Sequence, residues 1–274
     1  MNRRNFNQGA LGLALGAFAA RQVNAQDAAA RTPEKSQSKA KTFVLVHGAW
    51  YGGWCWKKVA KELRAAGHYV STPTCPGVGE AKHLLSKDIT LTTHVTSIVN
   101  HIQYEGLSDV VLVGSGFSGL VISGVADRIP HTLRTLVYLD ALVVPNGVSA
   151  FDAQPAEITR KRLEQVAREG NGIAIPPPPL STYDIVAEED KAWVGSLLTP
   201  HPVGPYQEKF HLKNPIGNGV PRIYVDCVAH SFAPLAKLKK DIRAQPGWIW
   251  RELDARHDPM VTEPHLLNEF LQSI

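Results

Sequence analysis

Short apolar runs alternate with longer amphipathic stretches along most of this 274-residue chain. Unbroken apolar runs are typical of strands that are buried on both faces, whereas apolar residues that recur every three or four positions predict helices. The pattern predicts strands over residues 43–46, 68–71, 109–113, 135–139, 222–225 and 248–253, and helices over residues 54–66, 91–104, 120–127, 234–243 and 263–272. This alternation predicts an α/β fold, with a mostly parallel sheet flanked by helices.

The alternation stops between residues 145 and 221, where the chain becomes irregular and rich in proline. Two segments within this stretch keep a helical pattern, residues 157–168 and 190–198. We therefore expect a small helical cap over residues 145–221. It is inserted between two strands of a core that consists of residues 42–144 and 222–274.

The first residues have the pattern of an export signal. Arg3 and Arg4 precede a short apolar run, and a small-x-small cleavage pattern ends at Ala25. Paired arginines before such a run are typical of the twin-arginine route. We expect residues 1–25 to be a twin-arginine-type signal peptide and residues 26–41 to be a flexible lead-in, so that the mature protein is periplasmic or secreted.

Charge and cysteine content narrow the class of protein. The formal net charge of +4 falls to about +1 without the three arginines of the expected signal, and no basic stripe indicates nucleic-acid binding. Cys55, Cys75 and Cys227 lack the spacing of a metal site. Two of them could pair in an exported protein, but three half-buried thiols that act as small apolar residues are favoured. We expect a small-molecule substrate, no metal, no nucleic acid and no membrane partner after signal removal, and a homodimer is left open.

Residues 110–119 read Val-Val-Leu-Val-Gly-Ser-Gly-Phe-Ser-Gly. An apolar run breaks into a turn of small residues, and an apolar helical segment follows at once. This is the pattern of a nucleophile elbow, the strand-to-helix turn that presents the serine of Gly-x-Ser-x-Gly. Gly116 stands at the tip of this turn and can adopt its strained backbone without a Cβ clash.

Small and polar residues that follow other strands belong at the same edge of the sheet. The first strand is followed by His47, Gly48, Ala49 and Trp50, where the glycine lets the backbone approach a ligand. The amide of Ala49 or Trp50, together with that of Phe117, would form an oxyanion hole. The alternative is a plain strand-to-helix turn in which His47 is a hydrogen-bonded structural side chain.

A general base and its orienting acid also have candidates at strand ends. His257 follows the last strand, on a loop that can carry the imidazole to Gly116. Asp140 ends the strand after the elbow strand, and Asp226 ends the strand after the cap. Either carboxylate could accept the Nδ1 proton of His257, with Asp140 favoured. For each of them the alternative is a helix N-cap or a loop carboxylate.

Several segments carry a resemblance to a known family: Phe43-Val44-Leu45-Val46-His47-Gly48-Ala49-Trp50, Gly52-Gly53-Trp54-Cys55-Trp56, Val111-Leu112-Val113-Gly114, Tyr138-Leu139-Asp140-Ala141 and His257-Asp258-Pro259-Met260. With them, residues 42–274 resemble the α/β-hydrolase superfamily, and most closely its branch of hydroxynitrile lyases and plant methyl-ester esterases with their bacterial relatives. The resemblance implies a small cap over an apolar pocket, no metal and no organic cofactor. Members hydrolyse esters, cleave cyanohydrins or act on related small carbonyl compounds.

The chain departs from that family at the elbow. The family motif Gly-His-Ser-x-Gly-Gly is here Gly-Ser-Gly-Phe-Ser-Gly, so Gly116 occupies the serine position and cannot form an acyl-enzyme. Ser115 would point into the sheet, and Ser118 would satisfy a backbone group in the first helical turn. Either serine would act only if the turn were shifted by about one residue.

Three functions remain open. The favoured one is an esterase-type hydrolase of small apolar or aromatic esters, whose nucleophile is a displaced serine (Ser115 before Ser118) or a water held by His257. A non-hydrolytic lyase, decarboxylase or isomerase would instead use His257 and the oxyanion hole on a carbonyl substrate. The third is a ligand-binding protein that keeps a hydrolase shell without catalysis.

Overall fold

The computed structural model describes residues 40–230 and 232–274 of the chain. The expected signal peptide, residues 1–25, and nearly all of the expected lead-in lie outside these residues, so both remain predictions. Within the described ranges, no helix is long and apolar enough to cross a membrane.

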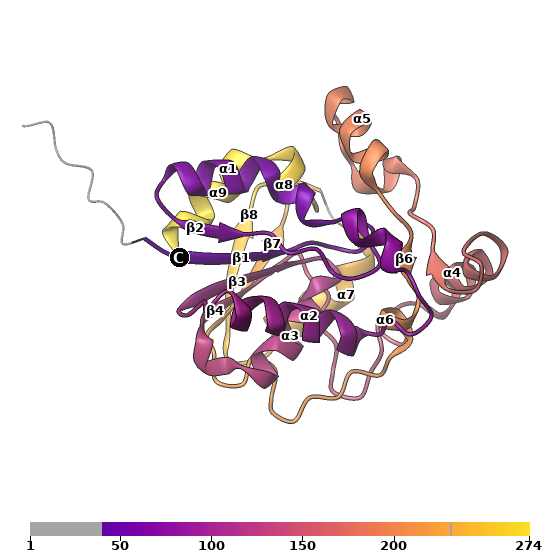
Figure 1. Ribbon diagram of the computed structural model, residues 1–274, viewed down its shortest axis with the longest axis horizontal. Coiled ribbons are helices and arrows are strands. Elements are labelled where there is room, and N and C mark those ends of the chain that lie inside the picture. The colour runs from indigo at the N-terminus through magenta and orange to yellow at the C-terminus, as the bar shows by residue number, and fades with distance from the viewer. Residues whose placement is uncertain (1–39, 231) are drawn as a thin grey trace, which may run out of the picture. The chain divides into compact units, whose positions relative to one another are not determined.

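A parallel six-stranded sheet runs through the described part of the chain (Figure 1). Its strands are β1 (Thr42–Val46), β2 (Tyr69–Ser71), β3 (Val110–Ser115), β4 (Leu133–Leu139), β7 (Arg222–Cys227) and β8 (Trp248–Leu253). Their order is β2-β1-β3-β4-β7-β8, and every neighbouring pair is parallel. Since helices cover both faces, the two central strands β1 and β3 are apolar without alternation, and β3 is buried along its whole length.

Paired helices cover the faces of the sheet. α1 (Lys57–Ala65) packs against α9 (Pro264–Ser273) on one face, and α2 (Leu91–Tyr104) packs against α3 (Ser118–Arg128) on the other (Figure 1). Thr90 caps α2 through its hydroxyl, which accepts from the amide of the third helical residue. The remaining core elements are η1 (Gly53–Trp56), η2 (Gly79–Leu84), η3 (Pro130–Thr132), η5 (Ala233–Leu235), α7 (Ala236–Arg243) and α8 (Pro259–Thr262).

The segment between β4 and β7 corresponds to the expected cap and is called the cap below. Its elements are α4 (Ala156–Glu169), β5 (Ala174–Ile175), η4 (Leu180–Tyr183), α5 (Glu188–Leu197), β6 (His201–Pro202) and α6 (Gly204–Gln207). α4 and α5 lie beyond the carboxyl ends of the sheet strands (Figure 1). β5 and β6 form an antiparallel pair. The sequence pattern does not predict this pair, because strands of two residues are too short to show an alternation.

The order of the strands places a topological switch point between β1 and β3. From β1 the chain continues to β2 on one side, and it then returns to form β3 on the other side of β1. The loops that leave the carboxyl ends of β1 and β3 therefore diverge, which is where open parallel sheets bind ligands. The loop at His47 follows β1 and the turn at Gly116 follows β3, so both lie at this switch point.

Candidate active site

The turn at Gly116 connects β3 to α3 in one step. Gly116 has a φ of +53°, a left-handed conformation that glycine adopts without a Cβ clash. Its carbonyl accepts from the Leu142 amide at 2.8 Å, which fixes the turn against the chain after β4. A Cβ built on Gly116 would lie 3.6 Å from Nε2 of His257. A side chain at this position would therefore face the imidazole.

The imidazole of His257 is oriented by Asp140. Nδ1 of His257 lies 2.6 Å from Oδ2 of Asp140, whose side chain is fully buried. A carboxylate accepts from Nδ1, so Nε2 keeps its lone pair toward Gly116. Burial alone would lower the pKa of His257, but the bond to Asp140 and the charges of Asp258 and Asp140 raise it above its ordinary value. The arrangement is that of a general base.

Asp226, the second acid considered from the sequence, contacts Lys239 and not the imidazole. Nζ of Lys239, on α7, lies 2.7 Å from Oδ1 of Asp226 and 2.5 Å from Oδ1 of Asp140. Burial would raise the pKa of Asp140, but His257 and Lys239 together hold it below its ordinary value. The sequence pattern did not single out Lys239, which has the appearance of an ordinary basic position on an amphipathic helix.

Left-handed backbone follows three neighbouring strands, and at two of these positions the residue is not glycine. Trp50, in the loop after β1, has a φ of +67°, and Asp140, directly after β4, has a φ of +43°. Aspartate tolerates the left-handed region, whereas a bulky residue such as tryptophan rarely adopts it. Each such residue costs about 1–3 kcal/mol and persists only where its surroundings hold it, as at functional sites. The indole of Trp50 is held by the cap, since Nε1 donates to the Ile175 carbonyl at 3.0 Å.

The loops after β1 and β3 provide three backbone amides without a partner among the described residues. Within residues 40–230 and 232–274, the amides of Ala49, Trp50 and Phe117 have no hydrogen-bond acceptor. Free amides on loops that follow adjacent strands can donate to a developing oxyanion. The arrangement is compatible with the expected oxyanion hole, in which Phe117 supplies one donor and Ala49 or Trp50 the other.

His47, Gly48 and the two serines lie around the elbow in different roles. Nδ1 of His47 bonds to the Gly48 carbonyl at 2.8 Å, and Nε2 accepts from the Cys75 amide at 3.0 Å. Burial lowers the pKa of His47, so it stays neutral and ties its own loop. The hydroxyl of Ser118 donates to the His47 carbonyl. The hydroxyl of Ser115 is buried and has no partner among the described residues.

Aromatic rings line the region beside the elbow. Phe117 stacks on Tyr206 with ring centroids 4.6 Å apart, and Tyr206 also contacts Phe151 and Trp50. On the other side, Phe232 stacks on His257 at 3.9 Å with an interplanar angle of 10°. Trp50 and Phe117 are recognisable in the sequence because each follows a predicted strand. The other rings are not, because the irregular cap and the loop after β7 carry no periodic signal.

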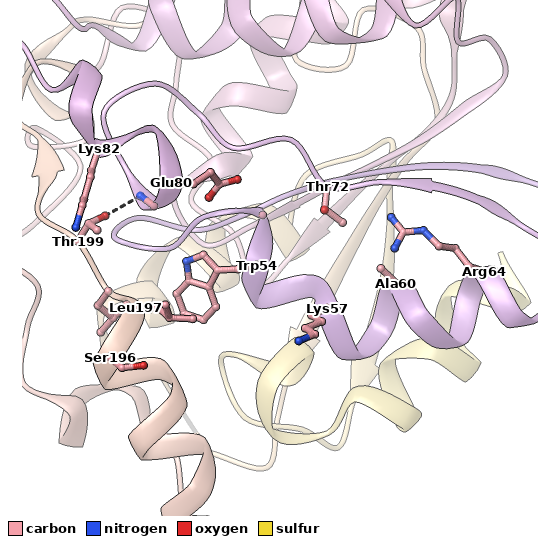
Figure 2. A pocket seen from close by; sticks show the side chains of 13 residues that line it. Trp54, Lys57, Ala60, Arg64, Thr72, Glu80, Lys82, Ser196, Leu197 and Thr199 are labelled. Atoms are coloured by element: carbon pink, nitrogen blue, oxygen red, sulfur yellow. Dashed lines mark hydrogen bonds between the residues drawn. The ribbon is translucent and has the colours of Figure 1, made fainter.

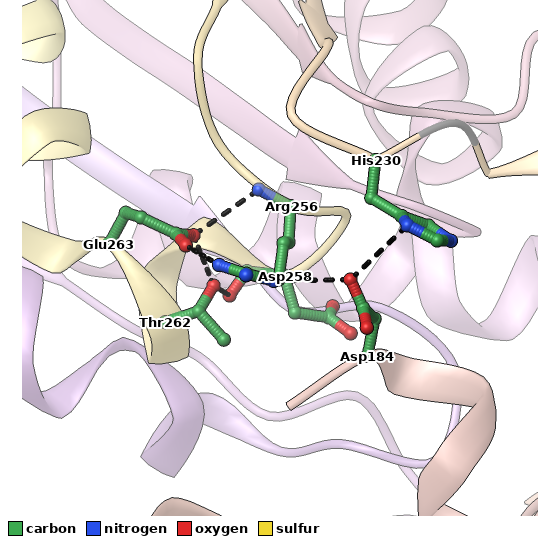
Figure 3. A network of polar contacts seen from close by, with 6 residues as sticks. All are labelled: Asp184, His230, Arg256, Asp258, Thr262 and Glu263. Carbon is green, nitrogen blue, oxygen red and sulfur yellow. Dashed lines mark hydrogen bonds and ion pairs between the residues drawn. The ribbon is translucent and has the colours of Figure 1, made fainter. Parts of the chain in front are cut away.

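The loop that carries His257 is anchored through its neighbour Arg256 (Figure 3). Arg256 donates from Nη1 to Oε1 of Glu263 at 2.7 Å and from Nε to Oδ2 of Asp184 at 3.1 Å. Nδ1 of His230 lies 3.5 Å from the same Asp184 oxygen. Asp184 directly follows η4, so this network joins the cap to the loops after β7 and β8.

A separate groove of about 600 Å³ lies between η1 with α1, the η2 turn and the end of α5 (Figure 2). Trp54 and Leu197 line it together with Lys57. At its rim, the Gly79 amide donates to the Thr199 hydroxyl at 2.8 Å. None of the residues described above for the elbow or its base lines this groove.

The described part of the chain contains no metal-binding cluster and no paired cysteines. No group of three or more His, Cys, Asp or Glu side chains there is arranged to hold a metal ion. Cys55, Cys75 and Cys227 are buried free thiols. Burial raises the pKa of each thiol, so these groups stay neutral and pack as small apolar side chains.

Comparison with known proteins defines the class to which this fold and site belong. A model of the α/β hydrolase family matches residues 43–270, and the chain belongs to that family. Its relatives place it in the branch of esterase-type hydrolases that contains plant methylesterases and their bacterial relatives.

Individual relatives cover most of the chain. It is 36% identical over 239 residues to a carbendazim hydrolyzing esterase of Nocardioides sp. (strain SG-4G), across 85% of this chain and 98% of that protein. It is 26% identical over 253 residues to the putative methylesterase 13 of Arabidopsis thaliana, across 86% of this chain and 56% of that protein. An extracellular α/β-hydrolase from a Paenibacillus species matches with a TM-score of 0.74 and 26% identity, across 85% of this chain and 98% of that one. These matches confirm the predicted fold.

Proposed function

We propose that this protein hydrolyses small aromatic or apolar esters, with a water molecule held by His257 as the nucleophile. One observation carries the proposal: the Cβ direction of Gly116 points at Nε2 of His257, only 3.6 Å away. Gly116 thus takes the place from which the serine of the family motif attacks. Without a side chain there, the space above the glycine is left to a water molecule and the substrate.

The hydroxyls of the neighbouring serines support water over a displaced serine. Ser118 already donates its proton to the His47 carbonyl, which keeps its oxygen beside the loop after β1. Ser115 is the last residue of β3, and its side chain is buried at 1% exposure. Neither hydroxyl has a hydrogen bond to His257, so neither is activated as a serine nucleophile must be.

In the proposed reaction His257 acts first as a base and then as an acid. Nε2 takes a proton from the water as its oxygen forms a bond to the carbonyl carbon of the ester. The negative charge moves to the carbonyl oxygen, where the amides of Phe117 and Ala49 or Trp50 stabilise it. The tetrahedral species then collapses, the carbon–alkoxide bond breaks, and Nε2 returns the proton to the leaving alkoxide. The products are one acid and one alcohol.

The rings beside the elbow support an aromatic or apolar substrate. Phe117, Tyr206, Phe151 and Trp50 contribute flat, largely buried surfaces next to the turn. Aromatic faces of this kind bind flat apolar groups through dispersion and stacking. The name of the Nocardioides relative adds carbendazim to the compounds that deserve a test.

The test follows turnover and covalent labelling together. The chain is incubated with phenyl acetate, methyl benzoate and carbendazim in ¹⁸O-water, and separately with a serine-reactive fluorophosphonate. We expect at least one substrate to yield an acid with one solvent oxygen, and no loss of activity with the fluorophosphonate. Gly116→Ser should become labelled at residue 116. The matched control is Gly116→Ala, which adds the Cβ without the hydroxyl, stays unlabelled and loses activity about tenfold or more because it fills the water's space.

Other outcomes would support the alternatives. Labelling of Ser115 or Ser118 in the unmodified chain, with loss of activity, would mean that a displaced serine attacks. Cleavage without uptake of solvent oxygen would indicate lyase or decarboxylase chemistry. Saturable binding without turnover of any compound would indicate a ligand-binding protein.

A further inference from the structure

Lys239 makes two contacts that the proposed reaction does not yet explain. Its side chain leaves α7, is only 12% exposed, and places Nζ between Oδ1 of Asp140 and Oδ1 of Asp226. A buried ammonium is costly unless it is paired. Here it is paired twice, and one of its partners is the acid that orients the imidazole.

The two oxygens of Asp140 are held by different groups. Oδ2 lies 2.6 Å from Nδ1 of His257, and Oδ1 lies 2.5 Å from Nζ of Lys239. Rotation of this carboxylate would break one of the two contacts, and the contact at Oδ2 sets the direction of the imidazole ring. Asp226 is 16% exposed, and its Oδ1 lies 2.7 Å from the same Nζ of Lys239.

We infer that Lys239 is a positioning residue of the proposed reaction: it locks Asp140 and weakens the pull of that carboxylate on the Nδ1 proton, while Asp226 holds Lys239 in place and moderates its charge. The inference rests on the proposed role of His257 as a base. The two acids then have different roles. Asp140 orients the imidazole of His257, and Asp226 holds Lys239 in place and moderates its charge.

Charge balance around His257 fixes the direction of each effect. Asp140 and Asp258 raise the pKa of His257, whereas Lys239 lowers it. The negative charge of Asp226 contacts Lys239 and therefore offsets part of the effect of that lysine on the pKa of His257. The uncharged groups nearby are the Phe232 ring, stacked on the imidazole, and the Tyr224 phenol and the Cys227 thiol, which burial keeps protonated by raising their pKa values. A neutral imidazole is required to take a proton from water, so Lys239 extends the pH range in which the base is active.

The test measures the pKa of His257 directly, so it does not depend on turnover of any ester. The full chain, labelled in its histidine side chains, is titrated by NMR, and the signal of His257 is assigned by its loss in His257→Gln. Lys239→Met should raise the pKa of His257 by about one pH unit, since it removes a nearby positive charge. Asp226→Asn should lower it by a smaller amount. Lys239→Arg, which keeps the charge, should stay close to the unmodified chain.

The deciding result is that Lys239→Met and Asp226→Asn shift the pKa of His257 in opposite directions. A purely structural loosening of the site would shift that pKa in the same direction in both variants. Shifts of the same sign, or no shift in either variant, would overturn the inference. Asp226→Asn and Lys239→Arg keep the test valid if Lys239→Met does not fold. Where an ester is turned over, the acid limb of kcat/KM should move with the measured pKa. If no ester is turned over, the proposed function fails while the titration still decides the role of Lys239.

Discussion

The two nitrogens of His257 face regions of opposite character. On the Nδ1 side, Asp140, Lys239 and Asp226 form a chain of close, largely buried ion pairs. On the Nε2 side stands Gly116, which has no functional group. The difference teaches that the imidazole is oriented by a charged network on one side, whereas residue 116 on the other side offers no side chain that could be covalently modified.

The largest effect should follow from removal of the base. We expect His257→Gln to lower kcat/KM for any hydrolysed ester by about 10³–10⁴-fold, because the proposed reaction assigns the proton of the attacking water to this imidazole. Initial rates measured against the unmodified chain test this. Unchanged rates would eliminate both the water mechanism and the non-hydrolytic alternative that uses His257.

The charged side of the imidazole should give the next largest effect. In Asp140→Asn the amide can donate to Nδ1, which moves the imidazole proton to Nε2 and leaves no lone pair toward Gly116. We expect a loss of about 10²–10³-fold in kcat/KM. Asp226→Asn is the matched control. It removes the same charge one ion pair farther from the imidazole and should cost less than about tenfold. Equal losses in the two variants would contradict the assignment of the acids.

Substitution of the two serines near Gly116 should give the smallest effects, and these should be mainly on stability. Ser118→Ala removes the buried hydrogen bond to the His47 carbonyl and should lower the free energy of unfolding by about 1–2 kcal/mol. Ser115→Ala removes an unpaired buried hydroxyl and should leave that free energy unchanged or slightly higher. Denaturant unfolding measures both. Each variant should keep its activity within about threefold, whereas a catalytic serine would lose far more.

The fold could be predicted from the long, regular hydrophobic patterns of the sequence. The helix expected over residues 91–104 and the strand expected over residues 248–253 have those bounds in the structure. The turn at Gly116 and the position of His257 were also recognisable, because a strand-to-helix turn of small residues and a histidine after the last strand are local features. The pair β5–β6 lies in the cap, where proline-rich, irregular sequence gives no period to read.

The roles of Asp140 and Lys239 could be distinguished only in the three-dimensional structure. Asp140 and Asp226 both end strands, and β4 and β7 are neighbours in the sheet, so the pattern places both carboxylates at one edge without ranking them. Lys239 lies among Lys237 and Lys240 on α7, and its sequence environment does not distinguish it from them. Only the way in which α7 packs against the sheet turns this one lysine toward the two acids.

Trp50 makes the loop after β1 dependent on the cap. Its carbonyl accepts from the Thr199 amide at 3.1 Å and its indole donates to the Ile175 carbonyl, so both of its tethers belong to the cap. Its left-handed backbone is strained and relies on those tethers. Displacement of the cap would therefore relax Trp50 and move the amides next to it. The cap segment thus holds the loop after β1 in its strained conformation through two hydrogen bonds.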